Sequence, residues 1–541
     1  MVLKNSLTLI NEFYFYISNK IRKLYLNSQI YNKKISKISK RSLDYKPNPS
    51  LLDCLIKYEK KKIKIEDLYL NSVWSNKDLN EKDHRNLHSF FWLFSLDLKS
   101  SKKTTRSVIL NWIEENQNYN KKNWRIDILS KRVIAWISNS KLTYEDSDEM
   151  YKNKFNIIIQ KQINHLINEI EVSKWVDDKM IGCASIILAG LSFKEKVKYL
   201  DFGLSLLKKI ISFSFDNNSF PKSRNIRQLN FYLKYFVLIR EWLKESQTDV
   251  PEYLDEIIYY LGQSYSILCQ DAEKNFLFNG NHESGNVDFE KYLISHGYKF
   301  KNDSIETGGY VVLKNKKITL AMDVGPSPEK KFSRDYQCGA LSFEIISGNK
   351  KLICNSGYFQ KNKHKLNGIS RTTANHSTLS IDNHSSCKIN SANSEIDNVL
   401  KILKKNIVMK KNYWNISASH DGYYKRYGVI HERQIEFFPE NNKIIGQDKL
   451  IKKKNFKSSN FEIRFHLEPN VKIMKTQDEK SILIDIESGG WKFISEGNII
   501  NVETGLYFGN KNSYTENQNF FISGITQNEE QIINWEFSKI T

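Results

Sequence analysis

The pattern of hydrophobic and polar positions changes its period near residue 305 of this 541-residue chain. Before that point, apolar residues recur at helical spacing. In WRIDILSKRVIAWIS, for example, Ile126, Leu129, Val133 and Trp136 fall on one face. The same pattern runs through MYKNKFNIIIQKQINHLINEI, CASIILAGLSF and DEIIYYLGQSYSILCQ. A series of helices of about 15–20 residues joined by short polar loops predicts helices buried pairwise, in an (α/α) toroid or solenoid.

After residue 305 apolar and polar residues alternate, as in GYVVLKNKKITLAMDVG and ALSFEIISGNKKLICNSGYF. Gly-Asn, Gly-Gly and Asn-Lys turns separate these runs, and no helical pattern intervenes, which predicts an antiparallel β-sandwich. The chain is also longer than one hydrophobic core supports. We therefore predict a basic amphipathic arm over residues 1–50, a helical (α/α) toroid domain over 51–305 and an antiparallel sandwich over 306–541.

The charge balance favours a polyanionic partner, because 82 Lys and Arg face 61 Asp and Glu and give a net charge of +21. The lysines are spread along the whole chain together with Asn and Ile, which is equally typical of drift toward an AT-rich genome. A nucleic-acid binder would need a continuous basic stripe with exposed aromatic residues, so we expect no nucleic-acid partner. The six cysteines are widely spaced without a CxxC pair, which indicates buried free thiols.

The N-terminal stretch MVLKNSLTLINEFYFYISNKIRKLYL lacks a clean apolar core and a small-residue cleavage site. It is typical of a basic amphipathic helix rather than of a secretory signal. No run approaches 18 apolar residues, so we expect no transmembrane segment. The compartment stays open between the cytoplasm and the cell envelope.

Three polar clusters could carry chemistry. The first, RTTANHSTLSID, places Arg371, Asn375 and His376 at the mouth of a predicted strand. These side chains could serve a substrate, or they could simply satisfy one another in a hairpin loop.

The second cluster, FPKSRNIRQLNFYLKYF, places Arg224 and Asn225 at the start of a predicted helix that carries Tyr232. Backbone N–H groups at a helix start favour an anion. The alternative is that Ser223 caps the helix and the tyrosine belongs to the core.

The third cluster, ASHDGYYKRYGVIHERQIEFF, contains His420, Tyr423 and His431. His431 and Arg433 are two residues apart, so both face one side of a strand. They could bind substrate or form a cross-strand polar pair. A metal site built from His420, Asp421 and His431 is a further alternative, although its spacing is not diagnostic.

Together these segments resemble heparinase II/III-like proteins. CGALSFEIISGNKKLICNSGY followed by RTTANHSTLSIDN resembles the C-terminal sandwich of that family, and ASHDGY, IHERQIEF, RFHLEPNV and GGWKF fit it. Upstream, SRN, the AGL of ILAGLSF and FNGNHESGNVD resemble the helical half. The resemblance covers about residues 70–530. It implies an (α/α) toroid followed by an antiparallel β-sandwich, in agreement with the two periods.

Characterised members of the family are carbon–oxygen lyases that cleave acidic, uronic-acid-containing polysaccharides by β-elimination. The resemblance implies the same activity here, in a cleft between toroid and sandwich, without a cofactor; a structural divalent metal stays an alternative. A base removes the C5 proton, a cationic group neutralises the uronate carboxylate, and an acid protonates the leaving oxygen. The catalytic residues implied are His376, Arg371 and Tyr232. The substrate-binding residues implied are Arg224, Asn225, Asn375, His420, Tyr423 and His431.

The sequence departs from the lyase pattern in two places. Where family lyases carry an Asn-His pair, this chain has WVDDKM with Asp177 and Asp178. Where they carry a tyrosine in an SPxYH-like context, it has SRNIRQL, and Tyr232 follows one turn later. The alternative function is therefore a non-catalytic protein on the same fold that binds acidic polysaccharide or assists envelope assembly. Sugar, linkage and oligomeric state stay open.

Overall fold

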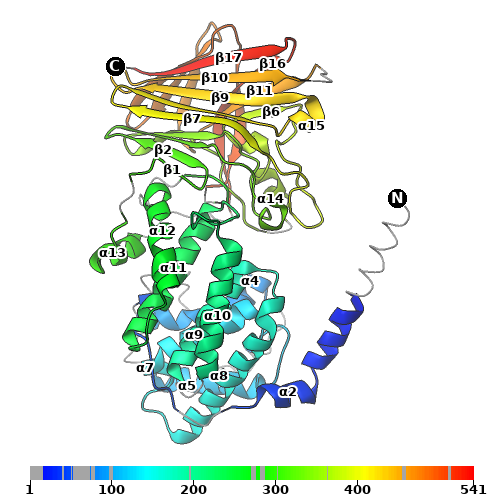
Figure 1. The fold of residues 1–541 in the computed structure, drawn as a ribbon, viewed down its shortest axis with the longest axis vertical. Coiled ribbons are helices and arrows are strands. Elements are labelled where there is room, and N and C mark those ends of the chain that lie inside the picture. Colours follow the sequence, from blue (N-terminus) through cyan, green and yellow to red (C-terminus); the bar gives the residue numbers. More distant parts are fainter. Residues whose placement is uncertain are drawn as a thin grey trace. The chain divides into compact units, whose positions relative to one another are not determined.

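A computed structural model describes residues 16–38, 42–49, 51–52, 74, 79–96, 102–193, 197–269, 276–280, 287–300, 303–361, 364–453, 458–509 and 513–540. Contacts divide the chain into two compact units (Figure 1). The first, called the helical unit, comprises residues 1–213 and 234–256. The second, called the β unit, comprises residues 214–233 and 257–541.

The helical unit consists of helices joined by short connections. Their bounds are α2 Gln29–Ile35, α4 Glu81–Ser89, η2 Phe91–Ser95, α5 Lys102–Glu115, α6 Ile126–Ser138, α7 Ser140–Thr143, α8 Glu149–Glu169, η3 Ile170–Val172, α9 Val176–Ser192 and α10 Val197–Ser214. Two further helices, α11 Ile226–Glu245 and α12 Glu252–Leu268, each belong partly to this unit and partly to the β unit. The helix predicted from WRIDILSKRVIAWIS is α6.

Close helix packing in this unit depends on small residues. A Cβ atom on Gly190 of α9 would lie 2.5 Å from the backbone nitrogen of Leu200 on α10, so only glycine permits this approach. Residues 22–35 pack on α8: Arg22 contacts Glu169, and the Tyr31 hydroxyl lies 2.7 Å from His165 Nδ1. No helix among the described residues is both long and apolar enough to cross a membrane.

The β unit contains three antiparallel sheets. The first has the order β1-β2-β3-β4-β5 (Glu306–Thr307, Tyr310–Lys314, Ile318–Asp323, Phe343–Ser347, Lys350–Ile353). The second has the order β12-β13-β14-β17-β10-β9-β8-β7 (Lys472–Lys475, Ser481–Ile486, Gly489–Ile494, Glu530–Lys539, Lys443–Lys452, Val429–Phe438, Tyr413–His420, Ile402–Lys410). The third has the order β15-β16-β11-β6 (Ile500–Tyr507, Thr515–Ile525, Asn460–His466, Leu379–Ile381). The unit also holds α13 Val287–Ser295, η4 Lys330–Phe332, α14 Lys365–Ser370, η5 Thr373–Asn375 and α15 Tyr424–Tyr427.

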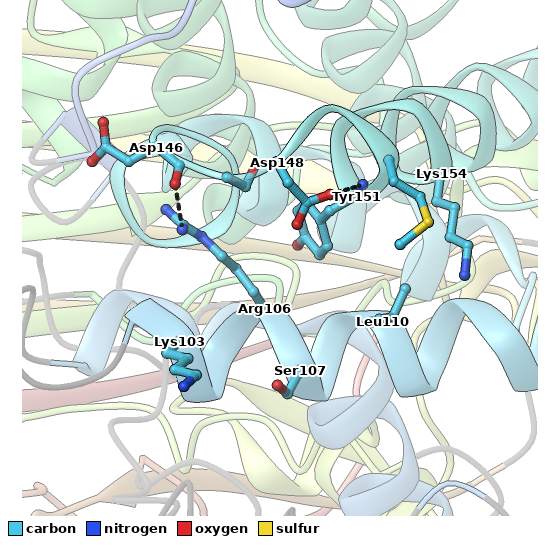
Figure 2. Close-up of a pocket in the computed structure, with 10 residues that line it drawn as sticks. Lys103, Arg106, Ser107, Leu110, Asp146, Asp148, Tyr151 and Lys154 are labelled. Carbon is cyan, nitrogen blue, oxygen red and sulfur yellow. Dashed lines mark hydrogen bonds between the residues drawn. The ribbon is translucent and has the colours of Figure 1, made fainter.

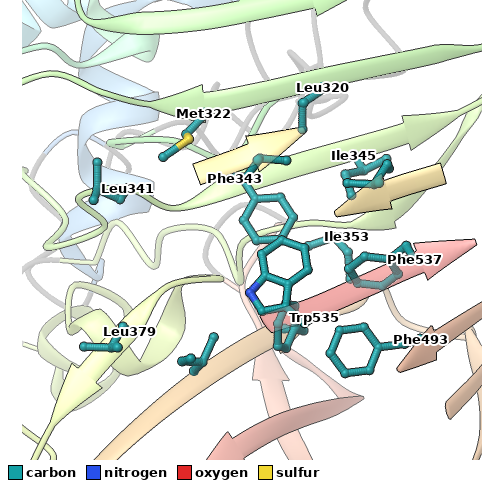
Figure 3. Packing of buried hydrophobic residues seen from close by; sticks show 14 of the residues in the cluster. Leu320, Met322, Leu341, Phe343, Ile345, Ile353, Leu379, Phe493, Trp535 and Phe537 are labelled. Atoms are coloured by element: carbon teal, nitrogen blue, oxygen red, sulfur yellow. The ribbon is translucent and has the colours of Figure 1, made fainter. Parts of the chain in front are cut away.

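One hydrophobic core receives side chains from all three sheets (Figure 3). Phe343 of β4 stacks on Trp535 of β17 with ring centroids 5.3 Å apart, and Phe465 of β11 meets the same indole edge-on. Buried and half-buried residues alternate strictly along β9, as the period of two predicts. The predicted fold, a helical toroid followed by an antiparallel sandwich, is confirmed.

The cysteines within the described residues are free and buried, as predicted: Cys183, Cys269, Cys338, Cys354 and Cys387. Cys54 lies outside the described residues.

Candidate functional site

His376 follows the short helix η5 and is almost completely buried, with 1% of its surface exposed. Its Nδ1 lies 2.9 Å from the Thr372 carbonyl oxygen, so Nδ1 carries the proton and donates it. The ring packs so tightly on Gly339 that a Cβ there would lie 2.6 Å from His376 Cδ2. Burial lowers the pKa of His376 to about 4, so the imidazole is neutral at pH 7 with an unprotonated Nε2.

The amide of Gln337 faces this unprotonated nitrogen. Gln337 Oε1 lies 3.4 Å from His376 Nε2, and this places two hydrogen-bond acceptors against each other. The amide nitrogen of Gln337 has no partner among the described residues. Rotating the amide by half a turn resolves both problems, because the Gln337 N–H then donates to the imidazole. With this amide orientation, His376 donates through Nδ1 to the Thr372 carbonyl oxygen and accepts at Nε2 from the Gln337 amide.

A chain of hydrogen bonds continues from Gln337 to Arg224. The Gln337 backbone N–H donates to Asn279 Oδ1 (3.4 Å), and Asn279 Nδ2 donates to Asp323 Oδ2 (3.1 Å). Arg224 Nη2 pairs with Asp323 Oδ1 at 2.5 Å. Burial raises the pKa of Asp323 above its usual value, and the Arg224 guanidinium opposes that shift. Three hydrogen-bonded residues thus separate His376 from Arg224.

Arg224 is held in a left-handed conformation, with φ of 55°, which a non-glycine residue rarely adopts. Its guanidinium also donates to the carbonyl oxygens of Gly308 and Pro326, at 2.8 and 2.7 Å, and its own carbonyl oxygen accepts from the Tyr310 hydroxyl at 2.6 Å. These bonds fix the SRN segment against the first sheet.

Asn225 caps helix α11. Its Oδ1 accepts from the Gln228 backbone N–H at 3.2 Å, so the cap lies two residues beyond Ser223, where the sequence suggested it. Its Nδ2 is buried without a partner among the described residues and abuts Gly280, whose φ is 82°. Tyr232, about two turns further along α11, is 1% exposed and meets Phe215 edge-on.

Arg371 holds three loop segments together. Nε donates to the Tyr336 carbonyl oxygen (2.8 Å), and Nη2 donates to those of Ser333 (3.1 Å) and Ser394 (2.9 Å). Only Nη1 remains for a substrate carboxylate. Asn375 is similarly engaged, since its Nδ2 donates to the Ile369 carbonyl oxygen at 2.7 Å.

The histidines of the third cluster lie inside the sandwich. The Gly422 N–H donates to His420 Nδ1 (3.0 Å), His420 Nε2 donates to His431 Nδ1 (3.2 Å), and His431 Nε2 donates to Asp448 (2.6 Å). Burial lowers the pKa of both histidines, so both are neutral, and this order of donors satisfies every ring nitrogen. The geometry therefore favours structural roles for His420 and His431 over substrate binding.

Two neighbours of that chain are equally enclosed. Arg433 pairs with Asp448 through Nε (2.8 Å) and Nη2 (3.0 Å), and the Tyr423 hydroxyl donates to the Leu379 carbonyl oxygen (2.8 Å). No group of three or more His, Cys, Asp and Glu side chains among the described residues is arranged to hold a metal ion.

The acidic pair Asp177 and Asp178 lies in the first turn of helix α9 of the helical unit. Asp178 is half-buried, and burial, with Asp127 and Asp177 nearby, raises the pKa of its carboxyl to about 7. This group therefore exchanges a proton near neutral pH.

Two of the cavities on the described surface are large enough to hold a ligand. A cavity of about 280 Å³ lies in the helical unit between α5 and the start of α8 (Figure 2). There Arg106 donates to the backbone oxygens of Glu145 and Asp146, while Asp148 accepts from the Tyr151 N–H at 2.8 Å. Arg106 and Asp148 thus hold the loop before α8 in place through these hydrogen bonds. The other cavity, of about 1090 Å³, is lined by Arg224 and other residues of the β unit.

Comparison with known proteins identifies the β unit. The family model for the heparinase II/III-like C-terminal domain matches residues 301–536. These residues are a heparinase II/III-like C-terminal domain. Solved structures resemble almost the entire chain. Heparan sulfate lyase HepC from Pedobacter heparinus matches with a TM-score of 0.64 at 14% identity, over 94% of this chain and 85% of that one.

A mutant of the same lyase gives a TM-score of 0.68 at 13% identity, with the same coverage. A heparinase III structure gives 0.68 at 14% identity, over 98% of this chain and 91% of that one. At these identities the likeness establishes the fold, a heparinase-like arrangement of helical and sandwich domains. No curated protein matches the sequence.

Proposed function

We propose that this protein is a polysaccharide lyase that cleaves a uronic-acid-containing polysaccharide by β-elimination. The observation that carries the proposal is His376: a neutral, rigidly oriented imidazole with an unprotonated Nε2, inside a heparinase II/III-like domain. The solved structures that share the fold include a heparan sulfate lyase and a heparinase III, which makes a glycosaminoglycan the first substrate class to test. The net charge of +21 favours such a polyanion.

In this proposal His376 acts through Nε2 as the base that removes the C5 proton. The contact with the Gln337 amide is long, at 3.4 Å, so a bound sugar displaces that amide at little cost. Thr372 keeps the ring in the required tautomer through Nδ1. The pKa of about 4 means that the base form is present throughout the neutral range and is lost only in acid.

Two further groups complete the chemistry. Arg371 neutralises the uronate carboxylate through Nη1, the nitrogen that its three carbonyl contacts leave over. The proton for the leaving oxygen comes from a tyrosine. The sequence offers Tyr232 as one candidate. Tyr358 is a second candidate, because the loop that carries it is joined to the Asn375 loop: the Ser356 N–H donates to the Asn375 carbonyl oxygen at 3.1 Å.

The test is the ultraviolet absorbance of the unsaturated uronate that β-elimination creates. Purified protein is incubated with heparan sulfate, chondroitin sulfate, alginate and polygalacturonate. We expect absorbance to rise with at least one polymer, to stay flat with His376→Ala, and to persist with His384→Ala, a half-buried histidine of the same unit. Melting curves of both variants exclude loss of folding as the cause.

No rise with any polymer, together with salt-sensitive binding to one of them, would instead establish the alternative, a non-catalytic protein that binds acidic polysaccharide or assists envelope assembly. The acidic residues that replace the Asn-His pair would then mark the loss of activity.

A further inference from the structure

The larger cavity of the β unit has the size and lining of a ligand site. Its volume of about 1090 Å³ is slightly above the usual range for small-molecule pockets. Its walls come from the loop before α11, the second half of α12, the β1–β2 region and the start of β7. Arg224 borders the cavity, whereas His376, Arg371 and Gln337 do not line it, so it is a different place from the one proposed for catalysis.

One wall offers a flat aromatic ring with amides beside it. Tyr260 and Gln263 lie on one face of α12, one turn apart, and both line the cavity. The Tyr260 side chain is 43% exposed, although it is a large hydrophobic group. Asn217 and Asn218 add further amides. An exposed ring that can cover the apolar face of a sugar, with amides placed for its hydroxyls, is suited to a saccharide.

Among the cations that line the cavity, Lys404 is the one without an ion pair to a described residue. Lys405 is paired with Glu306 at 2.5 Å, and Arg224 is paired with Asp323. Asp216 accepts the backbone N–H groups of Asn218 and Phe220, both at 2.9 Å. Lys404 is exposed at the cavity wall and forms no ion pair with any described residue.

We infer that this cavity binds an acidic saccharide unit, with Tyr260 stacked on the ring and Lys404 paired with its carboxylate or sulfate. The inference rests on the proposed function for the class of ligand, since a lyase acting on a long acidic polymer gains affinity from a second contact along the chain. Lys404 and Tyr260 stand on different elements, β7 and α12, so the site is fixed by the tertiary fold.

A simpler role for Lys404 is protection of a sheet edge. β7 is the last strand of the eight-stranded sheet, and exposed lysines on edge strands prevent association with other strands. Lys410 at the far end of β7 serves that role equally but does not line the cavity. Tyr424 of α15 is 48% exposed, and it does not line the cavity either. These two residues supply matched controls.

The experiment measures binding separately from turnover. Calorimetric titration with heparan sulfate and polygalacturonate oligosaccharides is carried out on the full chain carrying His376→Ala. Adding Tyr260→Ala and Lys404→Ala is expected to weaken binding about tenfold, and adding Tyr424→Ala and Lys410→Ala to leave it unchanged. Equal affinities for the two triple variants, or no binding of either ligand to the His376→Ala parent, would overturn the inference.

The two proposals fail in different ways. If the wild type produces no unsaturated product but binding depends on Tyr260 and Lys404, the lyase proposal is refuted and the saccharide site stands. If His376→Ala abolishes turnover while the cavity variants bind as tightly as their controls, the catalytic proposal stands and the saccharide site is refuted.

Discussion

Lowering the pH from 7 to 5 should destabilise the β unit steeply, because this unit buries neutral histidines. His376 has its pKa lowered by burial to about 4, and His466 has its pKa lowered, again chiefly by burial, to about 3. In the unfolded chain both titrate near 6.5. Between pH 6.5 and the folded values the unfolded state therefore binds more protons, so the free energy of unfolding falls as the pH falls.

The magnitude follows from linkage. Each such histidine loses about 1.4 kcal/mol per pH unit below 6.5, which gives about 2 kcal/mol between pH 7 and 5. The pair then removes about 4 kcal/mol, a large part of the stability of an ordinary domain. His420 and His431, whose pKa values burial also lowers, act in the same direction. Burial raises the pKa values of Asp323 and Glu468, so these carboxyls act in the opposite direction as the pH approaches their folded pKa values.

Urea unfolding followed by tryptophan fluorescence at pH 7, 6 and 5 measures the effect. His466→Gln provides the decisive comparison: its amide can replace the bond from Nε2 to the Ala374 carbonyl oxygen (3.0 Å), and it does not titrate. The variant should be less stable than the wild type at pH 7 but lose about 2 kcal/mol less on acidification. Parallel losses in both proteins would refute the reasoning.

Three substitutions test other features. Asp323→Asn should lower the free energy of unfolding by about 3–5 kcal/mol in urea titrations, because it leaves the buried Arg224 guanidinium without its partner; a change below 1 kcal/mol would contradict a buried ion pair. Gly339→Ala should reduce turnover more than stability, since the added Cβ displaces the His376 ring, and unchanged kcat would contradict that role. Asp178→Asn should gain stability relative to the wild type as the pH rises from 5 to 8: with a folded pKa near 7, the native carboxyl destabilises the fold as the pH rises, and a difference that stays constant with pH would contradict this.

Periodicity predicted what depends on local order along the chain. The change of period near residue 305 separated helices from strands, and the two-residue spacing of His431 and Arg433 placed both on one face of β9. What it could not supply was their shared partner. Asp448 lies on β10 and meets them through the register of the antiparallel pair, where it stands opposite Arg433.

The environment of His376 was harder still to predict. Gln337, Asn279 and Asp323 come from three separate stretches, and each looks like an ordinary turn or strand-end residue in the sequence. Hydrogen bonds between loops that are far apart in the sequence produce no periodic pattern of residues from which they could be predicted. The roles inferred for Arg371 and His376 came from the family resemblance alone. The resemblance did not indicate that backbone carbonyl oxygens already accept from Nε and Nη2 of Arg371.

The path of the chain bears on how this protein can be dissected. The recognisable family domain spans 301–536, but the β unit also recruits residues 214–233, which lie in an excursion from the helical unit. That excursion carries Arg224, the counter-ion of Asp323. A fragment cut at the family boundaries would bury a carboxylate with no cation to match it, and a single cut cannot release either unit whole. For expression, proteolysis or domain exchange, the smallest piece that keeps its electrostatics intact must begin before Ser214.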